Sequence, residues 1–495
     1  MKSNKQKCLK DDNNTLKNGS NFLSSIFTII LLGLISACSD SSDDTDGTGY
    51  FKLYNASKNS PTVYLEIDDE AITQASFSES STLYPMESQS YQLDLLWKED
   101  TNSYNEFYQQ ELDITDDDIS LIIVSGDFDN PEISIFDYYD EQQDLEDDDD
   151  QERFSLNLIN LTSTLPSLDF YISADNESFN EAVLVESAIG KVITDSHLFE
   201  LESYVFYITE PGSEEVLYQS ASLDYFFTTQ YVIAIRENTG PGDSPVTIDQ
   251  IGRTGSAVEI SDKDASAELR IYNGLEQHSL LETFEDSINI EINGLNDQQQ
   301  ILDLAKGVMS ETIELSAGDY SLDLLNSDSG ETITSNHFVS LDANQDKTVF
   351  VYLSEEYEDS DNDSTTPDET KIYLNSLLVE NSNRISLYDH QVNVINLVQD
   401  ADEEFTSLEV YFVRTNETVS SAEYGLTSSH ATPRTLVLPN NTYQVSVIAE
   451  IDQSERLLVF DSLTLDAESG DLFMLIEEDQ ENSEGYSIQF IPQTN

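Results

Sequence analysis

The chain has 495 residues, of which 97 are Asp or Glu and 21 are Lys or Arg, so its formal net charge is −76. Phosphate binding needs Lys and Arg, so this balance excludes a nucleic-acid-binding protein and argues against electrostatic docking on anionic lipid. Apolar residues make up 38% of the chain and aromatic residues 10%, too many for a disordered acidic tail. The length predicts about three to five domains.

The first 37 residues have the pattern of a signal peptide. An apolar stretch at 22–37 is short for a membrane-spanning helix, and it follows a segment with five lysines: Lys2, Lys5, Lys7, Lys10 and Lys17. The stretch ends Leu34-Ile35-Ser36-Ala37-Cys38, which resembles the bacterial lipobox. An ordinary secretory signal with a chance cysteine is the alternative.

The lipobox resemblance implies cleavage before Cys38, lipid on its thiol, and a durable membrane anchor. Ser39 follows Cys38, which by the enterobacterial sorting rule favours the outer membrane, with the face of that membrane left open. Residues 38–48 then form an acidic, Ser-rich tether. The removed segment holds five Lys and two Asp, so the mature chain has 16 basic and 95 acidic side chains and a net charge of −79.

The only other cysteine, Cys8, lies in the segment that would be removed. The domains that follow therefore contain no thiol, which excludes a disulfide, a cysteine nucleophile and a Cys-ligated zinc. We expect each domain to bury its own apolar core.

Three short patterns recur four times in the same order, which predicts tandem domains. The first reads apolar, polar, apolar, apolar, Asn, and ends at Asn55, Asn160, Asn273 and Asn396. The second begins at Tyr91, Tyr204, Tyr320 and Tyr443, and three of its copies alternate with period 2, as strands do. The third is a more apolar run at 121–124, 231–235, 349–353 and 472–476. The predicted repeats are 49–150, 151–264, 265–390 and 391–495.

Each repeat holds seven or eight strand candidates in roughly 100 residues, which is the size of an immunoglobulin-like sandwich. The expected fold is therefore all-β: four tandem immunoglobulin-like antiparallel β-sandwich domains after a lipoprotein signal peptide. No repeat has a strong helical period, and residues 296–309 are the best helical candidate. Acidic runs at 144–150 and 355–369 are interpreted as solvated linkers or loops, the second as an insert in repeat 3.

The recurring Tyr has two interpretations: a tyrosine corner, with its hydroxyl bound to a neighbouring loop, or a plain core side chain. The recurring Asn is expected to cap a turn through its side chain, with a ligand role as the alternative.

The opening of repeat 1, Tyr54-Asn55-Ala56-Ser57 followed by Ser60-Pro61 and the run Val63–Ile67, resembles a bacterial domain of unknown function. That domain occurs in tandem on secreted and lipid-anchored proteins. The resemblance implies an immunoglobulin-type sandwich and no activity. Repeats 2 to 4 keep the strand and the Asn but differ after it.

No catalytic or nucleotide-binding motif is present, and the five His residues are scattered: His197, His278, His337, His390 and His430. Asp359, Asp361 and Asp363 have the oxygen spacing of a calcium loop, but Ser364 and Thr370 stand where an EF-hand needs Gly and Glu. A solvated loop is the alternative there. We expect no enzyme activity and no cofactor, with weak calcium binding as the exception.

The expected function is that of a lipid-anchored cell-envelope protein with a structural, adhesive or interaction role. The alternative is an envelope binding protein for a glycan or a divalent cation. The sequence does not identify the protein or glycan partner.

Overall fold

The structure, a computed structural model, describes residues 47–493 except 101–102, 148–151, 277–280, 282–283, 285–286, 296, 359–368, 383, 399–404, 406, 452–453, 480–481 and 483–484. The signal peptide, Cys38 and the calcium candidates Asp359, Asp361 and Asp363 lie outside the described residues, as does His278.

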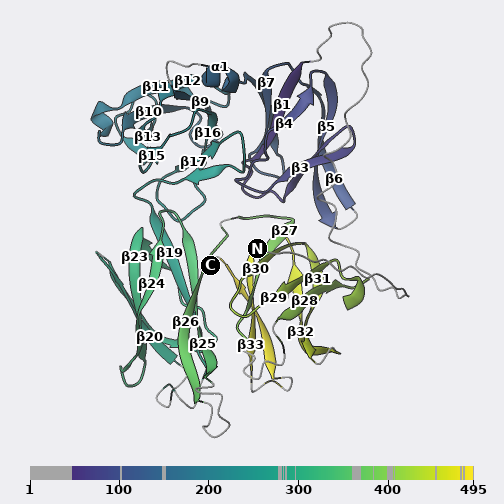
Figure 1. The fold of residues 1–495 in the computed structure, drawn as a ribbon, viewed down its shortest axis with the longest axis vertical. Helices are drawn as coiled ribbons and strands as arrows, with labels where there is room; N and C mark the ends of the chain where they lie inside the picture. The colour runs from purple at the N-terminus through teal and green to yellow at the C-terminus, as the bar shows by residue number, and fades with distance from the viewer. Residues whose placement is uncertain are drawn as a thin grey trace, which may run out of the picture. The chain divides into compact units, whose positions relative to one another are not determined.

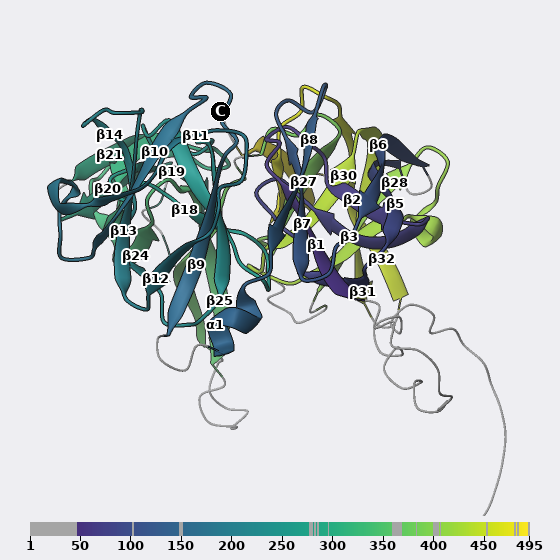
Figure 2. The same cartoon turned by 90° about the horizontal axis from the view of Figure 1, so that it is seen from above.

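The described chain is almost entirely β-strand and forms four two-sheet sandwiches, which confirms the predicted fold class. The strands of each sandwich lie together in Figure 1, and Figure 2 shows the same strands from above. We number the sandwiches 1 to 4 in chain order.

Sandwich 1 contains β1 (Thr48–Asn55), β2 (Val63–Ile67), β3 (Glu70–Ala75), β4 (Tyr84–Glu87), β5 (Ser90–Asp100), β6 (Ser103–Asp113), β7 (Asp118–Ser125) and β8 (Glu132–Tyr139). Its sheets have the orders β4-β1-β7-β8 and β3-β2-β5-β6. A short helix, α1 (Gln142–Asp147), leads to sandwich 2. Part of the acidic run at 144–150 is therefore helical, and Leu145 within it is buried.

Sandwich 2 contains β9 (Arg153–Asn160), β10 (Leu168–Ala174), β11 (Val183–Ile189), β12 (His197–Glu200), β13 (Ser203–Thr209), β14 (Val216–Gln219), β15 (Leu223–Asp224), β16 (Gln230–Glu237), β17 (Val246–Ile251) and β18 (Val258–Ile260). The sheet orders are β12-β9-β16-β17-β18 and β11-β10-β13-β14, with β15 also paired to β13. A 3-10 turn, η1, covers Phe179–Glu181.

Sandwich 3 contains β19 (Ser266–Gly274), β20 (Ser287–Gly294), β21 (Gln298–Ala305), β22 (Ile313–Ser316), β23 (Gly318–Asn326), β24 (Thr332–Leu341), β25 (Asp346–Glu358) and β26 (Glu369–Glu380). Sandwich 4 contains β27 (Asp389–Asn396), β28 (Leu408–Arg414), β29 (Tyr424–Ser428), β30 (Arg434–Pro439), β31 (Asn441–Ile451), β32 (Ser454–Leu465), β33 (Leu472–Glu478) and β34 (Tyr486–Pro492), with the 3-10 turn η2 at Val419–Ser421. The sheets are β22-β19-β25-β26 and β21-β20-β23-β24, then β30-β27-β33-β34 and β29-β28-β31-β32.

The three repeated patterns occupy the same places in every sandwich. The strand ending in the repeated Asn runs parallel to the strand of the third pattern, as β1 does with β7, β9 with β16, β19 with β25 and β27 with β33. The Tyr-initiated strand lies in the facing sheet, as β5 does between β2 and β6. Among the described strands all other pairs are antiparallel, so each sandwich has one parallel pair there that the sequence did not predict.

The best helical candidate of the sequence, residues 296–309, contains a strand instead, because residues 298–305 form β21. Asp303 has φ of +53°, and the β20–β21 register shifts between Ile288 and Ile290. Because of this irregularity, Ile301 and Leu304 both face the core although they are three residues apart, whereas a regular strand turns every second residue to the same face. A spacing of three between apolar residues is also typical of a helix.

Each sandwich has a separate apolar core, as expected from burial alone. Two further buried clusters lie between sandwiches. One joins sandwiches 1 and 2 and consists of Tyr54, Leu121, Ile123, Ile159, Leu161, Val232, Ala234 and Ile251. The other joins sandwiches 3 and 4 and consists of Tyr272, Phe350, Val379, Ile395, Phe473, Leu475 and Ile491. In each sandwich, one face of the parallel strand pair packs on the sandwich's own core and the other face packs on the neighbouring sandwich. Burial on both faces explains why these strands are mostly apolar and do not alternate.

Smaller contacts join the remaining neighbours. Asn344, two residues before β25, exchanges side-chain hydrogen bonds with Asn238 of sandwich 2 at 2.9 and 3.1 Å. Between sandwiches 1 and 4, the backbone N–H of Thr62 donates to Asp389 at 3.2 Å. The ring of Tyr388, just before β27, lies 4.3 Å from the ring of Trp97, centroid to centroid.

Candidate functional site

The four repeated tyrosines make the same hydrogen bond. Each hydroxyl donates to the backbone carbonyl four residues upstream: Tyr91 to Glu87 at 3.2 Å, Tyr204 to Glu200 at 3.0 Å, Tyr320 to Ser316 at 2.7 Å, and Tyr443 to Pro439 at 2.7 Å. The rings pack against the sandwich cores. This is the geometry of a tyrosine corner, so these residues hold the turn before the central strand.

The four repeated asparagines are buried and close the first strand in one way. Each Oδ1 accepts a hydrogen bond from the backbone N–H two residues on, at 3.1 Å for Asn55, 3.0 Å for Asn160, 3.1 Å for Asn273 and 2.9 Å for Asn396. In sandwiches 1 to 3 the amide group also donates to the edge strand of the facing sheet, on Ala75, Ile189 and Leu304. The Asn therefore fixes the loop that follows it and ties the two sheets together.

A buried polar network lies in the junction between sandwiches 1 and 2. Tyr54 donates its hydroxyl to Oδ2 of Asp249 at 2.6 Å, and Arg236 binds the same carboxylate with Nε at 2.8 Å and Nη2 at 3.2 Å. Burial raises the pKa of Tyr54 well above its usual value, and the Asp249 carboxylate adds to this effect. Burial alone would lower the pKa of Arg236, but Asp249 and other acidic neighbours raise it above its usual range. Both groups therefore keep their protons in this junction.

Lys52 lies two residues before Tyr54 on the same face of β1 and is almost completely buried. Its ammonium group donates to the backbone carbonyl of Gly252 in sandwich 2. Burial, and secondarily the nearby charge of Arg253, lowers the pKa of Lys52 to about 8.

The junction between sandwiches 3 and 4 uses equivalent positions. The Tyr272 hydroxyl lies 2.6 Å from Oε2 of Glu477, and Arg270 donates Nη1 to the carbonyl of Pro492 at 3.2 Å. Two positions of the first repeated pattern therefore differ between odd and even repeats. Repeats 1 and 3 have a basic residue followed two positions later by Tyr, namely Lys52 and Tyr54, and Arg270 and Tyr272. Repeats 2 and 4 have Asn and Ile at the same positions, namely Asn157 and Ile159, and Asn393 and Ile395. This alternation was visible in the sequence and marks the chain as two odd–even pairs.

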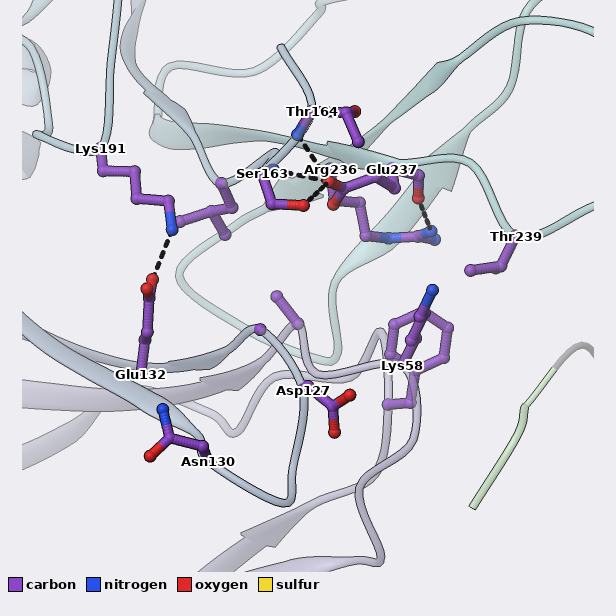
Figure 3. Close-up of a pocket in the computed structure, with 14 residues that line it drawn as sticks. Lys58, Asp127, Asn130, Glu132, Ser163, Thr164, Lys191, Arg236, Glu237 and Thr239 are labelled. Carbon is purple, nitrogen blue, oxygen red and sulfur yellow. Dashed lines mark hydrogen bonds and ion pairs between the residues drawn. The ribbon is translucent and has the colours of Figure 1, made fainter. Parts of the chain in front are cut away.

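Beside the first of these junctions, the loops of sandwiches 1 and 2 enclose a pocket of about 410 Å³ (Figure 3). We call it the junction pocket. Its walls come from the loops after the two repeated asparagines, from the turn after β7, and from the end of β16. The lining residues are Ala56, Lys58, Phe77, Gly126, Asp127, Asn130, Glu132, Leu161, Ser163, Thr164, Lys191, Arg236, Glu237 and Thr239.

The charged side chains of the junction pocket are largely paired. Glu237 accepts hydrogen bonds from the backbone and hydroxyl of Ser163 and from the backbone of Thr164, and these bonds lower its pKa in spite of burial, which raises it. Lys191 is ion-paired with Glu132 across the pocket (Figure 3). The lining carries three cations and three anions, so it is locally neutral in a protein of net charge −76.

The remaining predicted site residues do not come together. Within the described ranges, no group of three or more His, Cys, Asp or Glu side chains could hold a metal ion. His390 bonds to Asn440 at 2.8 Å and His430 lies 3.0 Å from the carbonyl of Val398, so these two side chains support loops of sandwich 4. No helix in the described part of the chain is both long enough and apolar enough to cross a membrane.

Comparisons with known proteins identify no family for this chain, but they find solved structures that resemble it. No protein-family model matches the chain, and no curated protein matches it. Solved structures with a likeness include the Bacillus anthracis TIE protein (9% identity, 89% of this chain and 75% of that chain, TM-score 0.15). A DUF3823 family protein from Bacteroides ovatus is 12% identical, with 41% of this chain and 100% of that chain covered and a TM-score of 0.12. BcpA, the major pilin subunit of Bacillus cereus, is 8% identical, with 66% of this chain and 99% of that chain covered and a TM-score of 0.14. At these scores the likenesses carry no argument about what the chain does.

Proposed function

We propose that this protein is a lipid-anchored component of the bacterial cell envelope, and that its four sandwiches serve a structural, adhesive or interaction role. The supporting observation is the way in which the sandwiches are joined. Each odd–even pair shares a buried apolar cluster and a polar network, so the two sandwiches of a pair present their outer loops in a fixed arrangement. Fixed loops suit a binding or spacing role, because little conformational freedom is lost on association.

The proposed anchor is the lipidated thiol of Cys38, and its test is a pair of cysteine variants. Cys38→Ala should lose the acyl mass and leave the membrane fraction, because no other thiol remains in the mature chain. Cys8→Ala, in the segment that would be removed, is the matched control and should partition like the parent protein. Intact mass spectrometry and fractionation of cells measure both effects, and a Cys38→Ala protein that stays in the membrane fraction contradicts the anchor.

Protease treatment of intact cells distinguishes the surface from the periplasmic face. Pull-down of whole cells or envelope proteins with the mature chain then tests the adhesive role.

A second candidate function is a binding protein for a glycan or a divalent cation. The specific observation in its favour is the junction pocket, which is of the size that small-molecule sites have and lies among loops at the ends of two sandwiches.

A further inference from the structure

The junction pocket has hydrogen-bonding capacity that the protein does not use. Among the described residues, the ammonium group of Lys58, the amide of Asn130 and the hydroxyl of Thr239 make no hydrogen bond to protein; Lys58 and Asn130 are exposed to solvent and Thr239 is half-buried. Asp127 accepts bonds from Asn59 at 2.8 Å and from the backbone of Asp129 at 3.1 Å through Oδ1 only. Figure 3 shows Lys58 and Thr239 on the same side of the pocket, Lys58 from sandwich 1 and Thr239 from sandwich 2. Asn130 lies on the opposite side of the pocket, near Glu132 (Figure 3), so hydrogen-bonding side chains line both sides of the pocket.

The pocket also has an apolar part, formed by Ala56, Leu161 and Phe77. One face of the Phe77 ring is covered by the guanidinium of Arg236, 5.0 Å from the ring centroid. A ligand that suits this lining needs several groups that both donate and accept hydrogen bonds, together with C–H surface for the apolar side chains.

The charges of the lining argue against ionic ligands. A divalent cation prefers six to eight oxygen ligands, whereas the pocket brings three cations near its carboxylates. An oxyanion needs Arg or Lys side chains that no carboxylate already neutralises. Arg236 is held by Asp249 and Lys191 by Glu132, and the third cation, Lys58, lies close enough to the Asp127 carboxylate for their charges to interact. A neutral ligand avoids both difficulties.

The walls are fixed before any ligand arrives. Asn55 and Asn160 hold the two loops that follow them, and Arg236 is fixed by Asp249, which also binds Tyr54. Fixed loops lose little conformational entropy on binding, although the exposed side chains of Lys58 and Asn130 still have to be ordered by the ligand.

We propose that the junction pocket binds a short neutral saccharide, held by Lys58, Asn130 and Thr239. The inference rests on the second candidate function and is independent of the lipid anchor. It assigns that function to one site between sandwiches 1 and 2.

The test uses the mature full-length chain and four probes: glucose, galactose, N-acetylglucosamine and cellobiose. Saturation-transfer NMR detects binding and calorimetry measures the affinity, with calcium chloride and sodium sulfate as ionic comparisons. The pocket variant is Lys58→Ala with Thr239→Val, and the matched control is Lys263→Ala with Thr228→Val, outside the pocket. Melting curves establish that both variants fold, and Asn130→Trp, which fills the cavity from an exposed position, is a second pocket variant.

We expect at least one saccharide to bind, and the pocket variant to lose about tenfold or more in affinity, as two missing hydrogen bonds imply. Asn130→Trp should abolish binding, and the control should match the parent. The proposal is overturned if no probe saccharide binds, or if sulfate or calcium binds in the pocket in place of a saccharide. Saccharide binding that both pocket variants retain would keep the second candidate function and reject this site.

Discussion

At the residue scale, the repeated tyrosine shows how one hydroxyl can define a turn. Its ring is a core side chain in every repeat, and its hydroxyl always reaches the same carbonyl, four residues back. The Tyr443 bond is buried, whereas that of Tyr204 is exposed, so the four bonds should differ in their contribution to stability.

Replacement of Tyr443 by Phe tests that contribution. The change leaves the buried carbonyl of Pro439 without its donor, so we expect the free energy of unfolding of sandwich 4 to fall by about 1–2 kcal/mol. Tyr411→Phe is the control, because Tyr411 is half-buried in the same sandwich and its hydroxyl has no hydrogen bond among the described residues. Urea unfolding followed by circular dichroism measures both variants, and equal midpoints would show that the ring alone matters.

The roles of single residues were predictable only where the partner is local. The side chain of an Asn at a strand end reaches the backbone two residues on, so its turn-capping role can be inferred from sequence. The partner of Lys52 is Gly252, 200 positions away in another sandwich. That hydrogen bond forms only because the outer face of the sheet that contains β1 packs against sandwich 2, and a short sequence pattern does not predict which domains pack together.

At the element scale, strand positions were predictable because burial on one face gives a period of two. All four Tyr-initiated runs and all four third-pattern runs are strands, β5, β13, β23 and β31, and β7, β16, β25 and β33. The position of strand β21 was not predictable, because its register against β20 shifts and its buried apolar residues then have the spacing of a helix. The parallel pairing of the first- and third-pattern strands could not be predicted either, because the partner strand lies about 70 residues further along the chain, as β7 does from β1.

The odd–even pair should be the stable fragment, rather than the single sandwich. Residues 47–147 alone would expose Tyr54, Leu121 and Ile123, which are completely buried in the chain. We expect this fragment to melt at a lower temperature than residues 47–264 and to bind a hydrophobic dye, as an exposed apolar face does.

Fragments 265–380 and 265–493 provide the same comparison for the second pair. Equal melting temperatures for single and paired fragments would show that the shared clusters contribute little.

At the scale of the whole molecule, the excess of acidic side chains should make stability depend on salt. Like charges disfavour the compact state, and at about 0.01 M salt the screening length is roughly 30 Å, whereas at about 0.15 M it is about 8 Å. We expect the melting temperature of the mature chain to rise with sodium chloride, most steeply at the dilute end.

Magnesium and calcium at matched ionic strength separate screening from specific binding. A larger effect of calcium, lost in an Asp361→Asn variant, would support a site at the predicted loop. A melting temperature that does not change with sodium chloride would refute the repulsion argument.

The chain contains a single tryptophan, and its position has a practical consequence. Trp97 lies on sandwich 1, while the aromatic ring tilted against it, that of Tyr388, belongs to the segment that enters sandwich 4. Trp97 also packs against the core of sandwich 1, so its ultraviolet emission should respond to the loss of this contact as well as to the unfolding of sandwich 1. If sandwich 4 separates from sandwich 1 before either unfolds, the emission maximum will move to longer wavelength while the far-ultraviolet dichroism of the strands is unchanged. In a Tyr388→Ala protein, the shifted maximum should already be present in the absence of denaturant.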